Sequence, residues 1–161
     1  MGPLLLGALL LIGLPGVAVA AEWGGITPGV TTRESVRERY GAPSRESRQT
    51  VEGRETIQWV YEGARAPVGM KRMAVDFGLL TREGYRPALV RSFQLEPKSR
   101  IFERRNVVRG WGVPDRVGVR EGQEVFFYTS GLLVYFNKDG TDAISMVFTI
   151  PQPESPTPSA R

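Results

Sequence analysis

Five carboxylates are the side chains in this sequence that suit acid–base chemistry: Glu55, Asp76, Glu124, Asp139 and Asp142. Glycoside hydrolysis requires two carboxyl groups that face one cleft at a set separation. Asp139 and Asp142 are instead typical of a hairpin turn, because short acidic side chains favour turns. The turn carboxylates also lack the spacing of an EF-hand calcium loop. The sequence therefore assembles no catalytic pair, and we expect no catalytic, cofactor-binding or metal-binding residue.

Histidine and cysteine are both absent from the 161 residues. This composition excludes zinc sites built on these residues, Ser-His-Asp and Cys-His catalysis, disulfide bonds and pH switching by histidine. It also excludes a lipid anchor attached to a cysteine. We therefore expect a protein that is not an enzyme.

The first 20 residues are typical of a secretory signal peptide. An apolar run at 4–19 contains no charged side chain and is broken by Pro15 and Gly16, and small residues precede the bond between Ala20 and Ala21. The stretch before Pro15 is shorter than the roughly 20 apolar residues of a membrane helix. We expect cleavage between Ala20 and Ala21, no stable membrane insertion afterwards, and a periplasmic or secreted location. An uncleaved anchor is the alternative.

The formal net charge is +4, and arginine supplies most of the positive residues. An arginine-rich surface suits carboxylate or phosphate groups, which the guanidinium binds with two hydrogen bonds. The charges of both signs are interleaved and form no dense basic stripe, so we expect no nucleic-acid partner. Residues 151–161 are rich in proline and serine, which predicts a disordered tail.

The chain contains two similar segments, each with a short helix that ends at a glycine shortly before a proline. In the first, Thr31 and Glu34 form a capping box, and Gly41 ends the helix. In the second, Val107 and Trp111 take the places of two apolar residues of the first helix. Three strand-like runs follow each helix, at 55–61, 73–79 and 88–95, and then at 124–129, 132–136 and 143–150.

This organisation predicts an α+β fold of tandem α-β-β-β repeats, with antiparallel sheets and helices packed on one face. The expected divisions are a signal peptide at 1–20, a first αβββ unit at 21–98, a second at 99–150, and the disordered tail at 151–161. Chance similarity between two amphipathic segments is the alternative explanation of the repeat.

Side chains alternate along a strand, so each predicted strand has two faces. In the second unit, one face supplies the core, and the other also carries apolar side chains, namely Val125, Phe127, Leu133, Tyr135 and Val147. Such a face is either covered by the first unit, a long loop or a second copy of the chain, or it recognises a partner, with Phe127 and Tyr135 as anchors.

Two loops add candidate contacts to this surface. Val68 and Met70 lie in a long connection at 62–71, and Tyr85 lies in the connection at 81–87. Either loop suits contact with a partner, and the alternative is an ordinary solvated turn.

Several of these motifs resemble a known family. A Pro-Gly-Val-Thr sequence at 28–31, the short helix with its Gly-x-Pro ending, a Trp-x-Tyr strand at 59–61 and a Val-x-Phe strand at 75–77 resemble the SmpA/OmlA family. That family supplies the small lipoprotein E component of the β-barrel assembly machine. The doubled form, over 26–150, resembles the β-lactamase-inhibitor-protein-like fold. The resemblance implies an α+β fold, an envelope location and function through protein–protein binding. The missing cysteine does not fit lipoprotein anchoring, and no inhibitory loop can be matched.

The expected function is that of an exported, non-catalytic protein–protein interaction module of the bacterial cell envelope, with outer-membrane assembly or maintenance as one such role. The alternative is a proteinaceous inhibitor of a secreted hydrolase such as a β-lactamase. The expected partner is an envelope or secreted protein, and the sequence leaves a homodimer open.

Overall fold

The computed structural model describes residues 19–152. Residues 1–18 of the predicted signal peptide and residues 153–161 of the predicted tail lie outside the described part. The helical elements are α1 (Arg33–Tyr40), the short 3-10 helix η1 (Gly63–Arg65) and α2 (Arg104–Trp111). The strands are β1 (Arg45–Val51), β2 (Arg54–Glu62), β3 (Met70–Thr81), β4 (Gly84–Pro97), β5 (Arg116–Arg120), β6 (Gln123–Tyr128), β7 (Leu132–Phe136) and β8 (Ala143–Thr149).

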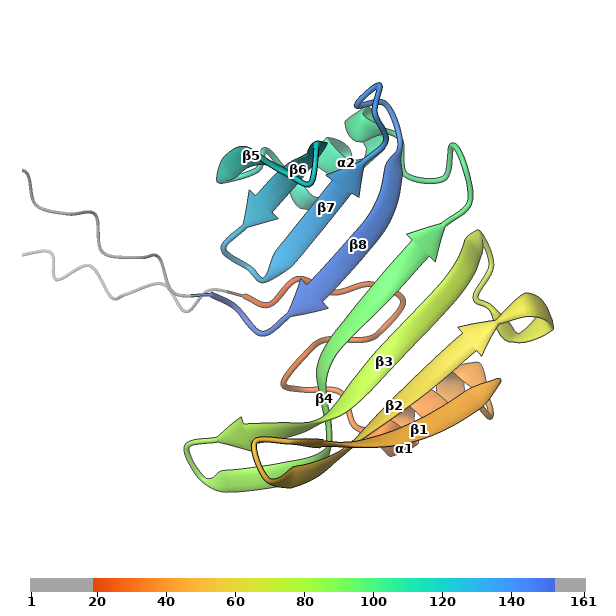
Figure 1. The fold of residues 1–161 in the computed structure, drawn as a ribbon, viewed down its shortest axis with the longest axis vertical. Coiled ribbons are helices and arrows are strands. Elements are labelled where there is room, and N and C mark those ends of the chain that lie inside the picture. The colour runs from red at the N-terminus through yellow and green to blue at the C-terminus, as the bar shows by residue number, and fades with distance from the viewer. Residues whose placement is uncertain (1–18, 153–161) are drawn as a thin grey trace, which may run out of the picture.

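All eight strands form one antiparallel sheet in the order β1-β2-β3-β4-β8-β7-β6-β5 (Figure 1). The predicted fold class is therefore wrong. The described part of the chain is mainly β, and it is one continuous sheet rather than tandem α-β-β-β repeats with separate sheets and helices packed on a face. The pairing of β4 with β8 makes the sheet continuous. Each α-helix is followed by four strands rather than the predicted three.

The strands β1 and β5, which are not among the predicted strands, are the two edges of the sheet. β1 reads RESRQTV and has no apolar alternation. β5 reads RVGVR, and its two alternate valines are exposed rather than half-buried. Each is joined to its neighbour by a two-residue Glu-Gly turn, at Glu52-Gly53 and Glu121-Gly122. Both residues of each turn have positive φ, between 50° and 78°. This conformation is a type I′ turn, whose twist matches that of the flanking strands.

Two register shifts change which side chains enter the core. A register shift between Asp76 and Phe77 leaves Arg91 without a partner in β3, which brings Val90 opposite Phe77, where it is completely buried. The alternation alone assigns Val90 to the opposite face. A second shift, after Tyr135, places Ala143 rather than Ile144 in the core, and Ile144 is left 39% exposed.

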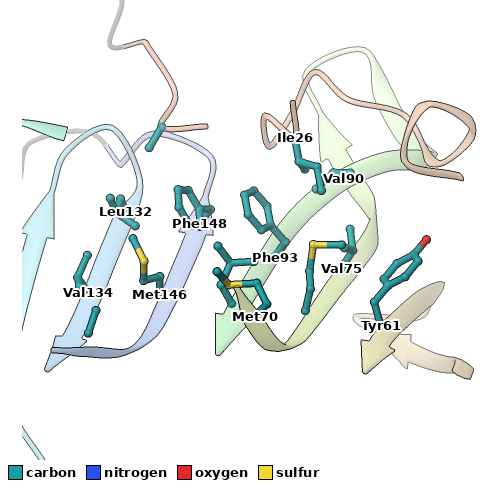
Figure 2. Packing of buried hydrophobic residues seen from close by; sticks show 14 of the residues in the cluster. Ile26, Tyr61, Met70, Val75, Val90, Phe93, Leu132, Val134, Met146 and Phe148 are labelled. Atoms are coloured by element: carbon teal, nitrogen blue, oxygen red, sulfur yellow. The ribbon is translucent and has the colours of Figure 1, made fainter. Parts of the chain in front are cut away.

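One hydrophobic cluster extends through both halves of the sheet and includes Val36 of α1 and Val107 of α2. The rings of Phe93 and Phe148 stack at 4.4 Å where β4 meets β8, and Figure 2 shows them side by side. Ile26, from the segment before α1, is also fully buried and lies beside Val90 in the same view. The core is therefore continuous across the β4–β8 junction.

The start of α1 differs by one residue from the sequence prediction, whereas its end does not. Thr32, rather than Thr31, is the N-cap, and its hydroxyl accepts a hydrogen bond from the Ser35 amide at 3.3 Å. The Thr31 hydroxyl instead accepts from the Thr27 amide at 2.9 Å, which ties the preceding turn together. Gly41 ends the helix with positive φ, as predicted. Within residues 19–152, no helix is long and apolar enough to cross a membrane.

Candidate partner-binding surface

Strand pairing places the predicted partner-binding residues of β6, β7 and β8 on one face of the sheet. Phe127 lies opposite Leu133, which in turn lies opposite Val147. Two residues further along each strand, Val125 lies opposite Tyr135. The core side chains Phe126, Val134 and Met146 occupy the alternate positions and therefore point to the other face. We call the face opposite the core the open face, and we call Phe127, Leu133, Tyr135 and Val147 the aromatic patch.

The members of the aromatic patch are partly exposed, whereas Val125 is not. Phe127, Leu133, Tyr135 and Val147 each keep part of their surface accessible. Val125 is 0% exposed, so its side chain is buried beneath its neighbours and cannot contact a partner directly.

Two arginines from the edge strand β5 frame the patch. The guanidinium groups of Arg116 and Arg120 lie 5.0 and 5.4 Å from the centre of the Phe127 ring, within the range of cation–π attraction. The Phe127 ring lies close over Gly118, where a Cβ atom would approach within 3.1 Å of the ring. Arg120 also donates a 3.5 Å hydrogen bond to the Tyr135 hydroxyl. Gly118 therefore provides the space in which the ring lies between the two arginines.

The charge of these two arginines is not balanced by ion pairs within residues 19–152. No carboxylate of the described residues lies within salt-bridge distance of Arg116 or Arg120. Two carboxylates of the neighbouring segments are engaged elsewhere: Asp115 accepts from the backbone and hydroxyl of Thr129, and Glu124 pairs with Arg104. The arginines can stack on the ring and still direct N–H groups toward a carboxylate of another molecule. The surface is thus apolar at its centre and positive at its rim.

The β1–β4 half of the open face has a different character. Asp76 accepts hydrogen bonds from Gln58 at 2.9 Å and from Ser92 at 3.1 Å. Arg72 pairs with Glu96 at 3.1 Å and with Glu62 at 3.9 Å. These polar groups satisfy one another, so this half of the face carries no comparable apolar surface.

The loop candidates do not join the aromatic patch. Val68 is 99% exposed, but it lies in the connection between β2 and β3. Met70 is only 2% exposed, so the expectation that it lies on the surface is wrong; it begins β3 and packs in the core. Tyr85 lies at the start of β4, where its hydroxyl donates to the carbonyl of Glu55.

Four of the five carboxylates considered for catalysis form hydrogen bonds or ion pairs with neighbouring side chains. Asp76 is bonded to Gln58 and Ser92, Glu55 pairs with Arg48, and Glu124 pairs with Arg104. Asp142 accepts a 3.3 Å hydrogen bond from Ser99, and Asp139 lies beside it in a shallow hollow. Among residues 19–152, no group of three acidic side chains is arranged to hold a metal ion.

Arg116, Gly118 and Arg120 were not predicted as part of the surface, because the predicted strands do not include β5. A signal was present, namely the two-residue Glu-Gly turn at 121–122, which links β5 to the aromatic run of β6. A two-residue turn that contains glycine, directly ahead of an apolar strand, favours a hairpin, and a hairpin requires a partner strand before the turn.

No family model and no curated protein matches the chain. Among solved structures, it is similar to a DUF4309 family protein (YjgB) from Bacillus subtilis, with a TM-score of 0.45 and 12% identity over 79% of this chain and 83% of that one. It is also similar to an extracellular protein containing an SCP domain from Bacillus anthracis, with a TM-score of 0.46 and 10% identity. That match covers 85% of this chain and 50% of the other. At these TM-scores neither likeness carries an argument. The resemblance to the SmpA/OmlA and β-lactamase-inhibitor-protein-like families stays a prediction.

Proposed function

We propose that the chain is an exported, non-catalytic protein–protein interaction module of the bacterial cell envelope. It binds an envelope or secreted protein through the aromatic patch. The observation that carries this proposal is the contrast within one face of the sheet. The β1–β4 half pairs its polar groups internally. The β5–β8 half presents Phe127, Leu133 and Tyr135 beside two arginines that form no ion pair with the described part of the chain.

The composition of the patch supports binding rather than simple solvation. Aromatic residues and arginine are enriched among the residues that dominate binding energy at protein interfaces. Phe127 is already held in place by Arg116 and Arg120, so less side-chain freedom is lost when a partner binds. The signal peptide predicted at 1–20 supports an envelope or secreted partner.

Affinity capture from an envelope extract tests the proposal, with the double variant Phe127→Ala/Tyr135→Ala compared with the unchanged chain. We expect the affinity of the variant for the partner to fall by about 30-fold or more, as it does when hot-spot residues are replaced. The matched control is Gln58→Ala/Ser92→Ala on the polar half of the same face, which should keep the partner. Retention of every partner by the Phe127/Tyr135 variant would falsify the assignment of this surface.

A panel of β-lactamases and cell-wall hydrolases provides a second readout. An interaction module of the envelope leaves these enzymes uninhibited at concentrations that saturate its partner. Inhibition that the Phe127→Ala/Tyr135→Ala variant relieves would instead identify the chain as an inhibitor that uses the same surface.

A further inference from the structure

The strand β5 is an open edge whose backbone groups can be assigned from the register. Arg120 and Gln123 flank the two-residue turn at 121–122. In such a hairpin, these two residues exchange both of their backbone hydrogen bonds. Pairs alternate along an antiparallel ladder, so Gly118 is also bonded to β6. The N–H and C=O groups of Val117 and Val119 therefore point away from the sheet. No hydrogen bond from another described element reaches them.

The other edge, β1, shows how this sheet protects a strand. By the same alternation, the backbone groups of Glu46 and Arg48 in β1 point away from the sheet. The Arg48 side chain forms ion pairs with Glu46 and with Glu55. Charged side chains along an edge oppose the addition of another strand. At the equivalent positions β5 carries Val117 and Val119, which are 53% and 72% exposed. The edge at β5 lacks the protection found at β1.

The side chains of β5 define what a strand added there must carry. Val117 and Val119 point to the core face, whereas Arg116, Gly118 and Arg120 point to the open face. An incoming strand then needs apolar residues opposite the two valines. It needs acidic residues opposite the two arginines, which have no carboxylate partner among residues 19–152.

We propose that β5 binds an extended acidic segment of the partner protein as a ninth, antiparallel strand of the sheet. This inference deepens the proposed function and rests on it, because Arg116 and Arg120 connect the edge to the aromatic patch. The segment alternates acidic, apolar, neutral, apolar and acidic residues. Its backbone pairs with Val117 and Val119, and its two carboxylates lie beside Arg116 and Arg120.

Charge argues against a second copy of this chain as the occupant. Two β5 strands that pair over all five residues place Arg116 of one copy directly opposite Arg120 of the other. Like charges in this cross-strand position are destabilising. The chain's own residues 153–161 are also poorly suited, because three of the nine are prolines, which cannot donate to a strand ladder.

The test uses a synthetic peptide, acetyl-Glu-Val-Thr-Val-Glu-amide with a fluorescent label, titrated into the exported chain by anisotropy. We expect saturable binding and slower hydrogen exchange at the amides of Val117 and Val119. The peptide with lysine in place of both glutamates should bind about tenfold more weakly or not at all. Binding that ignores this exchange of charge, or that leaves both amides unprotected, overturns the proposal.

Backbone methylation provides a control that does not alter the protein. Methyl groups on the nitrogens of both peptide valines block the hydrogen bonds to β5 and should abolish binding. A methyl group on the threonine nitrogen, which points away from β5, should leave binding unchanged. Equal effects of the two modifications overturn the strand-addition geometry.

Protein variants separate this inference from the proposed function. The double variant Arg116→Gln/Arg120→Gln should weaken the peptide by about tenfold. Val119→Pro should abolish peptide binding without loss of a sheet hydrogen bond, and Val119→Thr is its control. The peptide can fail to bind while the Phe127→Ala/Tyr135→Ala variant no longer captures the envelope partner. This result contradicts strand addition at β5 and supports the proposed function. If the peptide binds but the aromatic-patch variant keeps every partner, the proposed function falls instead.

Discussion

Two tyrosine hydroxyls donate to the carbonyl oxygens of the glycines that follow the helices. Tyr61 donates to Gly41 and Tyr128 donates to Gly112, each at 3.1 Å. Desolvation by burial raises the pKa of both phenols to about 12. Smaller contributions come from Arg37, which lowers the pKa of Tyr61, and from Asp115, which raises that of Tyr128.

These pKa values predict a loss of stability at high pH. Below pH 10, the tyrosines are protonated in both the folded and unfolded chains, so the stabilisation is fully present. Between about pH 10 and 12, the unfolded chain releases protons that the folded chain retains, so the free energy of unfolding falls. Urea unfolding between pH 8 and 12 measures this slope. Tyr61→Phe and Tyr128→Phe should each make it shallower, and an unchanged slope in both variants contradicts the assignment.

At the scale of elements, the two edge hairpins depend on glutamates in an unfavourable conformation. Glu52 and Glu121 have φ of 51° and 50°, a region in which asparagine and glycine are favoured. We expect Glu52→Asn and Glu121→Asn each to raise the free energy of unfolding by about 0.5–1 kcal/mol. Chemical denaturation measures the change, with Glu83→Asn, at a turn residue without positive φ, as the control. A decrease in stability for both hairpin variants contradicts the turn assignment.

How far the sequence predicts the elements depends on where their apolar residues lie. The six predicted strands appear as β2, β3, β4, β6, β7 and β8, because each carries core side chains at alternate positions. The edge strands bury little: β1 has no apolar periodicity, and the alternation of β5 is limited to two exposed valines between charged residues. The pairing of β4 with β8 is a long-range contact that local patterns cannot specify. Without these three features, two separate units appeared to be the natural arrangement.

The candidate surface was predictable to a similar extent. Alternation along β6 and β7 correctly groups Phe127, Leu133 and Tyr135 on one face, because this property belongs to each strand. Burial of Val125 depends on side chains from neighbouring strands, and the framing of Phe127 depends on the unrecognised β5. Met70 appeared to lie in a loop, although β3 begins at that residue.

At the scale of the whole molecule, the β4–β8 ladder connects β1–β4 to β5–β8 through only four residue pairs. Phe93 and Phe148 stack across this junction with ring planes 4° apart, and both are almost completely buried. We expect Phe148→Ala to reduce the free energy of unfolding by about 3–5 kcal/mol, because it leaves a cavity in the shared core. Phe148→Leu should cost less, since it retains most of the volume.

Denaturation followed by both tryptophan fluorescence and far-ultraviolet circular dichroism measures this cost and the cooperativity of unfolding. Because one cluster extends through both halves, the unchanged chain should show coincident transitions with both probes. Two separated transitions, or a small effect of Phe148→Ala, would mean that each half is stable without the junction.

The segment at the start of the predicted mature chain is part of the fold. Ala21 is 6% exposed, and its amide nitrogen donates to the carbonyl oxygen of Ser130 at 2.9 Å. Ile26, a few residues later, is fully buried. Cleavage between Ala20 and Ala21 turns this amide into the terminal amino group, which can still donate to Ser130, and leaves Ile26 in the core. We expect intact-mass measurement of the exported chain to give Ala21 as the first residue. Removal of residues 21–26 should lower the free energy of unfolding by at least about 2 kcal/mol, because the core loses Ile26. An exported chain that begins after Ile26 and unfolds at the same denaturant concentration contradicts this role for the segment.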